Sequence, residues 1–109
     1  MMITNDVNFQ SIEFFNLCKI HKVKELYAFG SVVNGNFTDL SDIDLIVEID
    51  EPNPLNRGEL LLSLWDQFER YFNRKVDLLT FKSLRNPYLK DSIHSTKRLI
   101  YNGSKEEVL

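Results

Sequence analysis

The sequence predicts a single α/β domain that spans residues 1–109. A chain of this length can build one hydrophobic core and does not need a disulfide to fold. The segments 23–29, 42–49 and 75–80 have the length and composition of strands, and 56–72 carries apolar residues at the helical period. No internal repeat or low-complexity segment interrupts this pattern, so we expect its strands and helices to share one core.

The first half of the chain is expected to hold one helix and two strands. The helix covers about 8–21, and the strand that follows ends at the tight turn Gly30-Ser31. Residues 32–41 must then return the chain to the strand at 42–49, through either a hairpin-like or a short helical connection.

The second half begins with a break at 50–54, where two prolines lack a backbone donor and disfavour helix in the residues before them. The strongest helix signal follows over 56–72, with apolar residues on one face and polar residues opposite. Asn86-Pro87 is a typical helix start for a helix that reaches about residue 94 or 95. The remaining expected elements are a strand over 75–80, an extended piece over 98–101 and a fraying end over 103–109.

Composition limits the kind of protein. The net charge of -3 argues against a general nucleic-acid-binding surface, although it permits a nucleotide bound through metal. The single cysteine, Cys18, lies in an apolar stretch and is expected to be a buried free thiol. No apolar run reaches the roughly 20 residues of a membrane helix, and the first residues do not resemble a secretory signal. We therefore expect a cytoplasmic protein without membrane contact.

The segment Asp42-Ile43-Asp44 opens the most informative strand. Its apolar residues alternate with polar ones, so both aspartates project from the same side of the strand. Two residues of strand rise separate their Cα atoms by roughly 7 Å. At an effective dielectric constant of 20, two charges at that distance repel by about 2 kcal/mol. A cation between the two carboxylates would remove this cost.

Three further residues complete a candidate site for phosphoryl or nucleotidyl transfer. Gly30 allows backbone N–H groups to approach a phosphate, and Ser31 adds a hydroxyl donor. Asp77 lies within a strand, where aspartate is disfavoured. If that strand lies beside the strand at 42–49, Asp77 joins Asp42 and Asp44 as a third carboxylate. Such a triad could hold two Mg²⁺ ions about 4 Å apart.

Each of these features also has an ordinary structural explanation. Gly-Ser is a common turn, an Asp-x-Asp sequence at a strand start is often a solvated edge or a helix cap, and Asp77 could be exposed on an edge strand. Their occurrence together and in this order favours a functional site. Other sites lack support, because the chain has one cysteine, two distant histidines, no P-loop and no G-x-S-x-G motif.

The combination of Gly30-Ser31, ten intervening residues and Asp42-Ile43-Asp44 resembles the nucleotidyltransferases of the DNA polymerase beta superfamily. The chain length, the Val76-Asp77-Leu78 segment and the Asn86-Pro87 helix start resemble the minimal nucleotidyltransferases of that group, the MNT-type antitoxins. The resemblance extends from about residue 19 to 101.

The resemblance implies a small mixed β-sheet flanked by helices, which binds ATP and two Mg²⁺ ions. It places the triphosphate at Gly30 and Ser31, the metals at Asp42 and Asp44, and a metal with the attacking hydroxyl at Asp77. Such proteins are often encoded beside a helical HEPN-type partner. Several of these pairs are toxin and antitoxin, in which the nucleotidyltransferase adds AMP to a tyrosine of the toxic ribonuclease. A hetero-oligomer with that partner is one possible assembly, and no direct nucleic-acid contact is expected.

One position departs from the family pattern, because Asn34 stands where many relatives carry a basic residue. Loss of that charge could weaken triphosphate binding by about 1 to 3 kcal/mol if the residue contacts phosphate. The leading hypothesis is transfer of AMP from ATP to a hydroxyl of a partner protein. The alternatives are a binding module that neutralises its partner without catalysis, and transfer to a small molecule such as an aminoglycoside.

Overall fold

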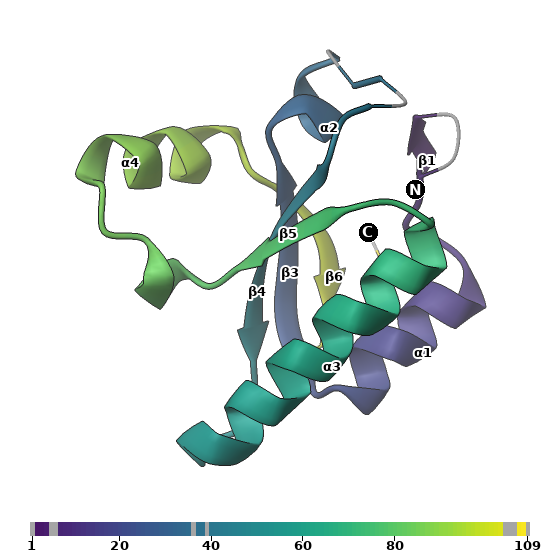
Figure 1. Cartoon of the computed structure of the whole chain (residues 1–109), viewed down its shortest axis with the longest axis vertical. Coiled ribbons are helices and arrows are strands. Elements are labelled where there is room, and N and C mark those ends of the chain that lie inside the picture. Colours follow the sequence, from purple (N-terminus) through teal and green to yellow (C-terminus); the bar gives the residue numbers. More distant parts are fainter. Residues whose placement is uncertain (1, 5–6, 36, 39, 104–106, 109) are drawn as a thin grey trace.

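The computed structural model describes residues 2–4, 7–35, 37–38, 40–103 and 107–108. Its centre is a mixed five-stranded sheet with the strand order β5-β4-β3-β6-β7. The strands β5, β4, β3 and β6 are labelled in Figure 1. The two strands β4 and β5 are parallel, and the other neighbouring pairs are antiparallel. The strands of this sheet are β3 (Val23–Phe29), β4 (Ile43–Ile49), β5 (Val76–Leu79), β6 (Arg98–Asn102) and β7 (Glu107–Val108).

Two helices, α1 (Ile12–Ile20) and α3 (Pro54–Phe72), pack on one face of the sheet (Figure 1). The stacked rings of Phe14 and Phe68, 5.4 Å apart, join the two helices. Cys18 is fully buried in the same core, as predicted. The mixed sheet and its flanking helices confirm the predicted fold class.

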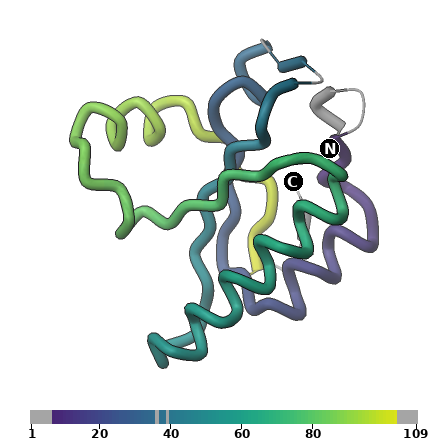
Figure 2. Tube along the Cα trace, viewed as in Figure 1, coloured from purple at the N-terminus to yellow at the C-terminus, as the bar shows by residue number. Residues whose placement is uncertain are grey.

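A second, smaller apolar cluster lies on the opposite face of the sheet. Ile46 of β4 is fully buried there with Leu84 and with Ile93 of α4 (Pro87–Thr96). Figure 2 shows the trace leave β5, pass through η1 (Phe81–Ser83) and α4, and return as β6. The excursion covers part of the sheet face that carries the even-numbered side chains of β4.

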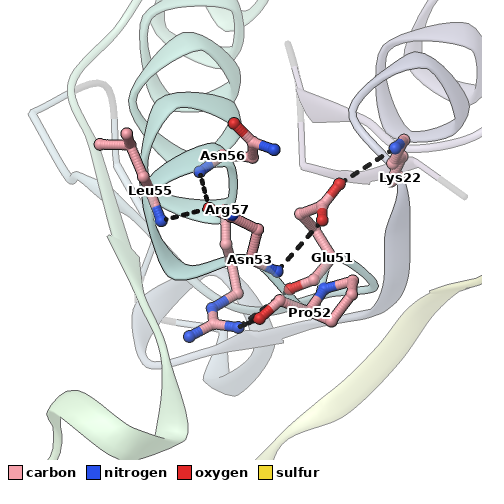
Figure 3. A network of polar contacts seen from close by, with 7 residues as sticks. All are labelled: Lys22, Glu51, Pro52, Asn53, Leu55, Asn56 and Arg57. Atoms are coloured by element: carbon pink, nitrogen blue, oxygen red, sulfur yellow. Dashed lines mark hydrogen bonds and ion pairs between the residues drawn. The ribbon is translucent and has the colours of Figure 1, made fainter.

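The segment between β4 and α3 forms a network of polar contacts, drawn in Figure 3. The Asn53 side chain accepts hydrogen bonds from the first backbone N–H groups of α3, and Pro54 occupies the first helical position. Glu51 accepts from the Asn53 backbone N–H and from Lys22, each at 3.1 Å. The Arg57 guanidinium donates to the Glu51 carbonyl oxygen at 2.9 Å. This cap starts α3 two residues before the predicted position.

Other boundaries differ in ways that have local causes. The strand at 23–29 is confirmed, whereas the first helix begins at Ile12 because the Ser11 side chain caps it. The connection after Gly30 is the short helix α2 (Ser31–Asn34). The expected fraying is wrong for Glu107 and Val108, which pair with β6, while 104–106 and 109 lie outside the described residues. The sequence also gave no sign of the paired strands β1 (Met2–Thr4) and β2 (Val7–Asn8).

Within the described ranges, every helix is too short or too polar to cross a membrane.

Candidate functional site

The sheet register brings the predicted site residues together at one end of β4. Asp44 of β4 lies directly opposite Asp77 of the parallel strand β5. On its other side, Asp44 lies opposite Phe29, the last residue of β3, so Gly30 follows immediately beside it. Asp42 precedes β4 by one residue. The condition set by the sequence, that the two aspartate-bearing strands are neighbours, is therefore confirmed.

Gly30 is in contact with the carboxylate of Asp44. Its φ of +70° lies in the region that favours glycine. A Cβ atom at this position would lie 2.5 Å from Asp44 Oδ2, closer than side chains tolerate. Ser31 then begins α2, and the Gly30 carbonyl oxygen accepts from the backbone N–H groups of Val33 and Asn34, each at 3.1 Å. The turn thus brings backbone directly onto the carboxylate cluster.

The three carboxylates are electrostatically unfavourable together. Burial, followed by the charge of Asp77, a hydrogen bond with Asp77 and the charge of Asp42, raises the pKa of Asp44 from 3.8 to about 6. The ionised form of Asp44 at neutral pH is therefore destabilised by its burial and by the neighbouring carboxylates. Asp42 has a counter-charge in Lys75, whose Nζ lies 3.7 Å from Asp42 Oδ2.

The donor chemistry of the cluster fits magnesium, which binds carboxylate oxygens and completes its octahedron with water and phosphate oxygens. A divalent cation would also offset the repulsion that raises the pKa of Asp44. As placed, no three His, Cys, Asp or Glu side chains of the described residues gather closely enough to hold a metal ion. The three-carboxylate, two-ion arrangement therefore stays a prediction.

Side chains of α3 hold the edge strand that carries Asp77. Trp65 Nε1 donates to the Val76 carbonyl oxygen at 2.6 Å, and Glu69 Oε2 accepts from the Val76 N–H at 3.0 Å. These contacts satisfy the outward-facing backbone groups of the residue before Asp77. The sequence did not reveal this role, because Trp65 matches the apolar pattern of the α3 core face.

Arg74 anchors the loop that leads into Asp42. Its Nη1 donates to the carbonyl oxygens of Thr38 and Ser41 at 3.1 and 3.2 Å, and its guanidinium lies 4.5 Å from the centre of the Phe37 ring. The sequence pattern gives Arg74 no role, because it falls between the predicted helix at 56–72 and the predicted strand at 75–80. The signal that could have found it is its place in a basic pair, Arg74-Lys75, directly before the strand that carries Asp77.

One cavity lies away from the carboxylates. It has a volume of about 520 Å³, opens at the far end of β4 beside the α1–β3 turn and is lined by residues that include His21, Glu51 and Ser63. Asp42, Asp44 and Asp77 are each half-buried, so the cluster remains accessible to solvent. Its chemistry, rather than enclosed volume, identifies it as the candidate site.

A mixed sheet that joins a glycine turn to three carboxylates has the architecture of a nucleotidyltransferase. Residues 15–100 match the family model described as "Nucleotidyltransferase domain". The chain is 46% identical over 81 residues to "Putative protein adenylyltransferase MJ1379" of Methanocaldococcus jannaschii, an alignment that covers 74% of this chain and 78% of the relative. A second protein of that organism with the same description, MJ0126, is 38% identical over 81 residues, with the same coverage of both chains.

Solved structures agree with this assignment. A structure described as "putative minimal nucleotidyltransferase" superposes with a TM-score of 0.56 and 28% identity, over 76% of this chain and 81% of that one. The fold is also shared with a toxin-antitoxin crystal structure "with AMP-PNP", at a TM-score of 0.64 and 20% identity, over 92% and 78% of the two chains. The chain belongs to the nucleotidyltransferase domain family, and its predicted membership of the minimal nucleotidyltransferases is confirmed. It is an enzyme of the nucleotidyltransferase class.

Proposed function

We propose that this enzyme transfers AMP from ATP to a hydroxyl group of a partner protein, with a tyrosine as the acceptor. The names of its curated relatives, which describe protein adenylyltransferases, support the reaction. The single structural observation that carries the proposal is the pairing of Asp44 with Asp77 beside the Gly30 turn. This juxtaposition suits a reaction in which a phosphate and an attacking hydroxyl meet at one group of carboxylates.

In this reaction, Gly30 and Ser31 bind the triphosphate at the start of α2. Asp42, Asp44 and Asp77 are the residues that would hold two Mg²⁺ ions, which supply charge stabilisation and lower the pKa of the acceptor hydroxyl. Asp77 orients that hydroxyl from the edge strand. The acceptor oxygen forms a bond to the α-phosphorus, the bond to the β-phosphate oxygen breaks, and pyrophosphate leaves. The acceptor proton passes to Asp77 or to solvent.

The partner that we propose is a helical HEPN-type toxin, for which this chain acts as the antitoxin. Toxin-antitoxin assemblies among the structures of the same fold support this pairing. Large apolar side chains on the surface of this chain also suit a protein interface. The most exposed of them are Ile12, Ile20, Leu40, Leu55, Leu62 and Tyr88.

The test is a transfer assay with labelled ATP, Mg²⁺ and candidate HEPN-type helical proteins, with mass spectrometry of the products. We expect a substoichiometric amount of enzyme to convert excess partner to a species heavier by one AMP. Changing Asp42 and Asp44 together to alanine should stop the conversion. The proposal is wrong if the doubly substituted protein still neutralises the partner at equal stoichiometry and neither protein leaves a nucleotide on it. That outcome would establish the non-catalytic binding module.

A further inference from the structure

Lys75 is placed at the carboxylate cluster by the backbone. Its carbonyl oxygen accepts a hydrogen bond from the Ile43 N–H at 3.0 Å, which fixes it beside the Asp42–Asp44 segment. It precedes Asp77 by two residues, so the strand period directs both side chains to the same face of the sheet. Among the ion pairs of the described residues, that of Lys75 with Asp42 alone involves one of the three site aspartates.

Arg74 and Lys75, the two cations between α3 and β5, differ in how firmly other residues hold their side chains. Arg74 makes two hydrogen bonds to loop carbonyl groups and covers the Phe37 ring, so its guanidinium is committed to the fold. The Lys75 side chain is 68% exposed, and its 3.7 Å separation from Asp42 is longer than a charge-assisted hydrogen bond. An exposed ion pair of this kind contributes little stability, so the ammonium group can exchange one anionic partner for another.

A nucleotide provides that other partner. ATP brings negative charge to a cluster that already contains three carboxylates, so a nearby cation would favour its binding. If Asp42 turns to bind metal, it gives up Lys75, whose ammonium group then lies beside the incoming phosphates. A lysine is a compact donor that suits phosphate oxygens as a point charge.

We propose that Lys75 binds the β- and γ-phosphates of ATP, the part that leaves as pyrophosphate, and that Asp42 holds the ammonium group in place until the nucleotide arrives. This inference rests on the proposed function, because it assumes ATP as the substrate. It assigns a phosphate-binding charge to Lys75, the residue directly before β5.

The test is isothermal titration of the whole chain with ATP and with AMP, each in the presence of Mg²⁺. Lys75→Gln should weaken ATP binding by about 10-fold and leave AMP binding within about twofold of wild type, since AMP lacks the two phosphates. Lys75→Arg keeps the charge and should retain most of the ATP affinity. The matched control is Lys24→Gln. Lys24 makes a similar exposed ion pair, 4.0 Å from Glu48, near the start of β3 and far from the Gly30 end of that strand.

Three outcomes would overturn the proposal. Equal ATP affinity in Lys75→Gln and wild type would show that Lys75 only neutralises Asp42. An equal loss of ATP and AMP binding would indicate a general effect on the site, and thermal unfolding of Lys75→Gln would show whether that effect is a loss of folding. Failure of the wild type itself to bind ATP would contradict the proposed function as well, so the two failures are distinguishable.

Discussion

The two ends of β4 differ in the electrostatic environment of their carboxylates. Beyond Ile49, the carboxylate of Glu51 accepts hydrogen bonds from the Asn53 backbone and from Lys22, in the network of Figure 3. At the start of the strand, Asp42 and Asp44 lie near Asp77 of the neighbouring strand. Lys75 Nζ lies 3.7 Å from Asp42 Oδ2. We call the end at Glu51 the satisfied end, because this carboxylate has hydrogen-bond partners. We call the end at Asp42 and Asp44 the unsatisfied end, because like charges lie close together there.

The pKa values record this difference. The backbone N–H of Asn53, and then Lys22, lower the pKa of Glu51, whereas burial and then the charge of Asp77 raise the pKa of Asp44 to about 6. The satisfied end starts the helix α3 and serves the fold. The unsatisfied end costs stability in the absence of a ligand, which is characteristic of a site that binds a cation.

The largest expected effect comes from removing a charge at the unsatisfied end. Asp77→Asn keeps the size of the side chain but removes the charge that we propose orients the acceptor, so transfer should fall on the order of 100-fold or more, where each tenfold is about 1.4 kcal/mol. Steady-state transfer rates measure this effect, with triphosphate binding affected less. Asp66→Asn, which breaks an exposed ion pair with Arg70 on α3, is the control and should retain full activity. Unchanged turnover in Asp77→Asn would identify Asp77 as an ordinary edge-strand residue.

The next effect concerns the close approach of Gly30 to Asp44. Gly30→Ala should lower the free energy of unfolding by roughly 1 to 3 kcal/mol, because its φ is +70° and its new Cβ would press on the carboxylate. Denaturant unfolding provides the measurement. The control is Gly58→Ala within α3, where no heavy atom lies within 4 Å of the new Cβ. That change should raise stability by about 0.5 to 1 kcal/mol, so a similar result at both positions would refute the Gly30 contact.

The third prediction uses pH to separate the two ends. The pKa of Asp44 is about 6 in the folded protein and 3.8 ordinarily, so the folded state binds more protons between these values. The metal-free protein should therefore gain stability from Asp44 as the pH falls from 7 to about 5. Glu51 acts in the opposite sense, since its lowered pKa makes its contribution disappear in more acidic solution. Thermal unfolding across this range should show the gain in wild type and not in Asp44→Asn; its presence in both would exclude Asp44 as the cause.

The smallest effect belongs to the satisfied end. Asn53→Ala removes the side chain that caps α3 and should cost about 1 kcal/mol of unfolding free energy. Nucleotide affinity should not change, because the cap lies at the opposite end of β4 from the carboxylates. Unfolding and ATP titration of this variant measure the two quantities. A loss of nucleotide affinity here would contradict the separation of the two ends.

Local sequence patterns were sufficient for much of the fold and for the placement of the aspartates. The alternation of β4 predicted that Asp42 and Asp44 share a face, and Asn86-Pro87 predicted the start of α4. The short strands β1, β2 and β7 were missed because two or three residues are too few for a periodic pattern.

The contacts that position the site depend on residues far apart in the sequence. The bond from Trp65 to the backbone of Val76 and the bonds from Arg74 to Thr38 and Ser41 arise only when α3, β5 and the loop before β4 meet. Hydrophobic periodicity describes one helix or strand at a time and carries no information about tertiary contacts between elements. For the same reason, the sequence predicted that Asp77 joins Asp44 only if their two strands are neighbours in the sheet. The parallel pairing of β4 and β5 meets that condition.

The central claim is that the like charges at the start of β4 form a cation site. Its most direct test is the thermal unfolding of wild type and Asp44→Asn at neutral pH, each with and without Mg²⁺ and a non-hydrolysable ATP analogue. Without metal, Asp44→Asn should be the more stable protein, because the substitution removes a half-buried charge and its repulsion with Asp77. Metal and nucleotide together should raise the melting temperature of wild type and have little effect on the variant. An equal increase in both proteins, or none in wild type, would contradict the claim.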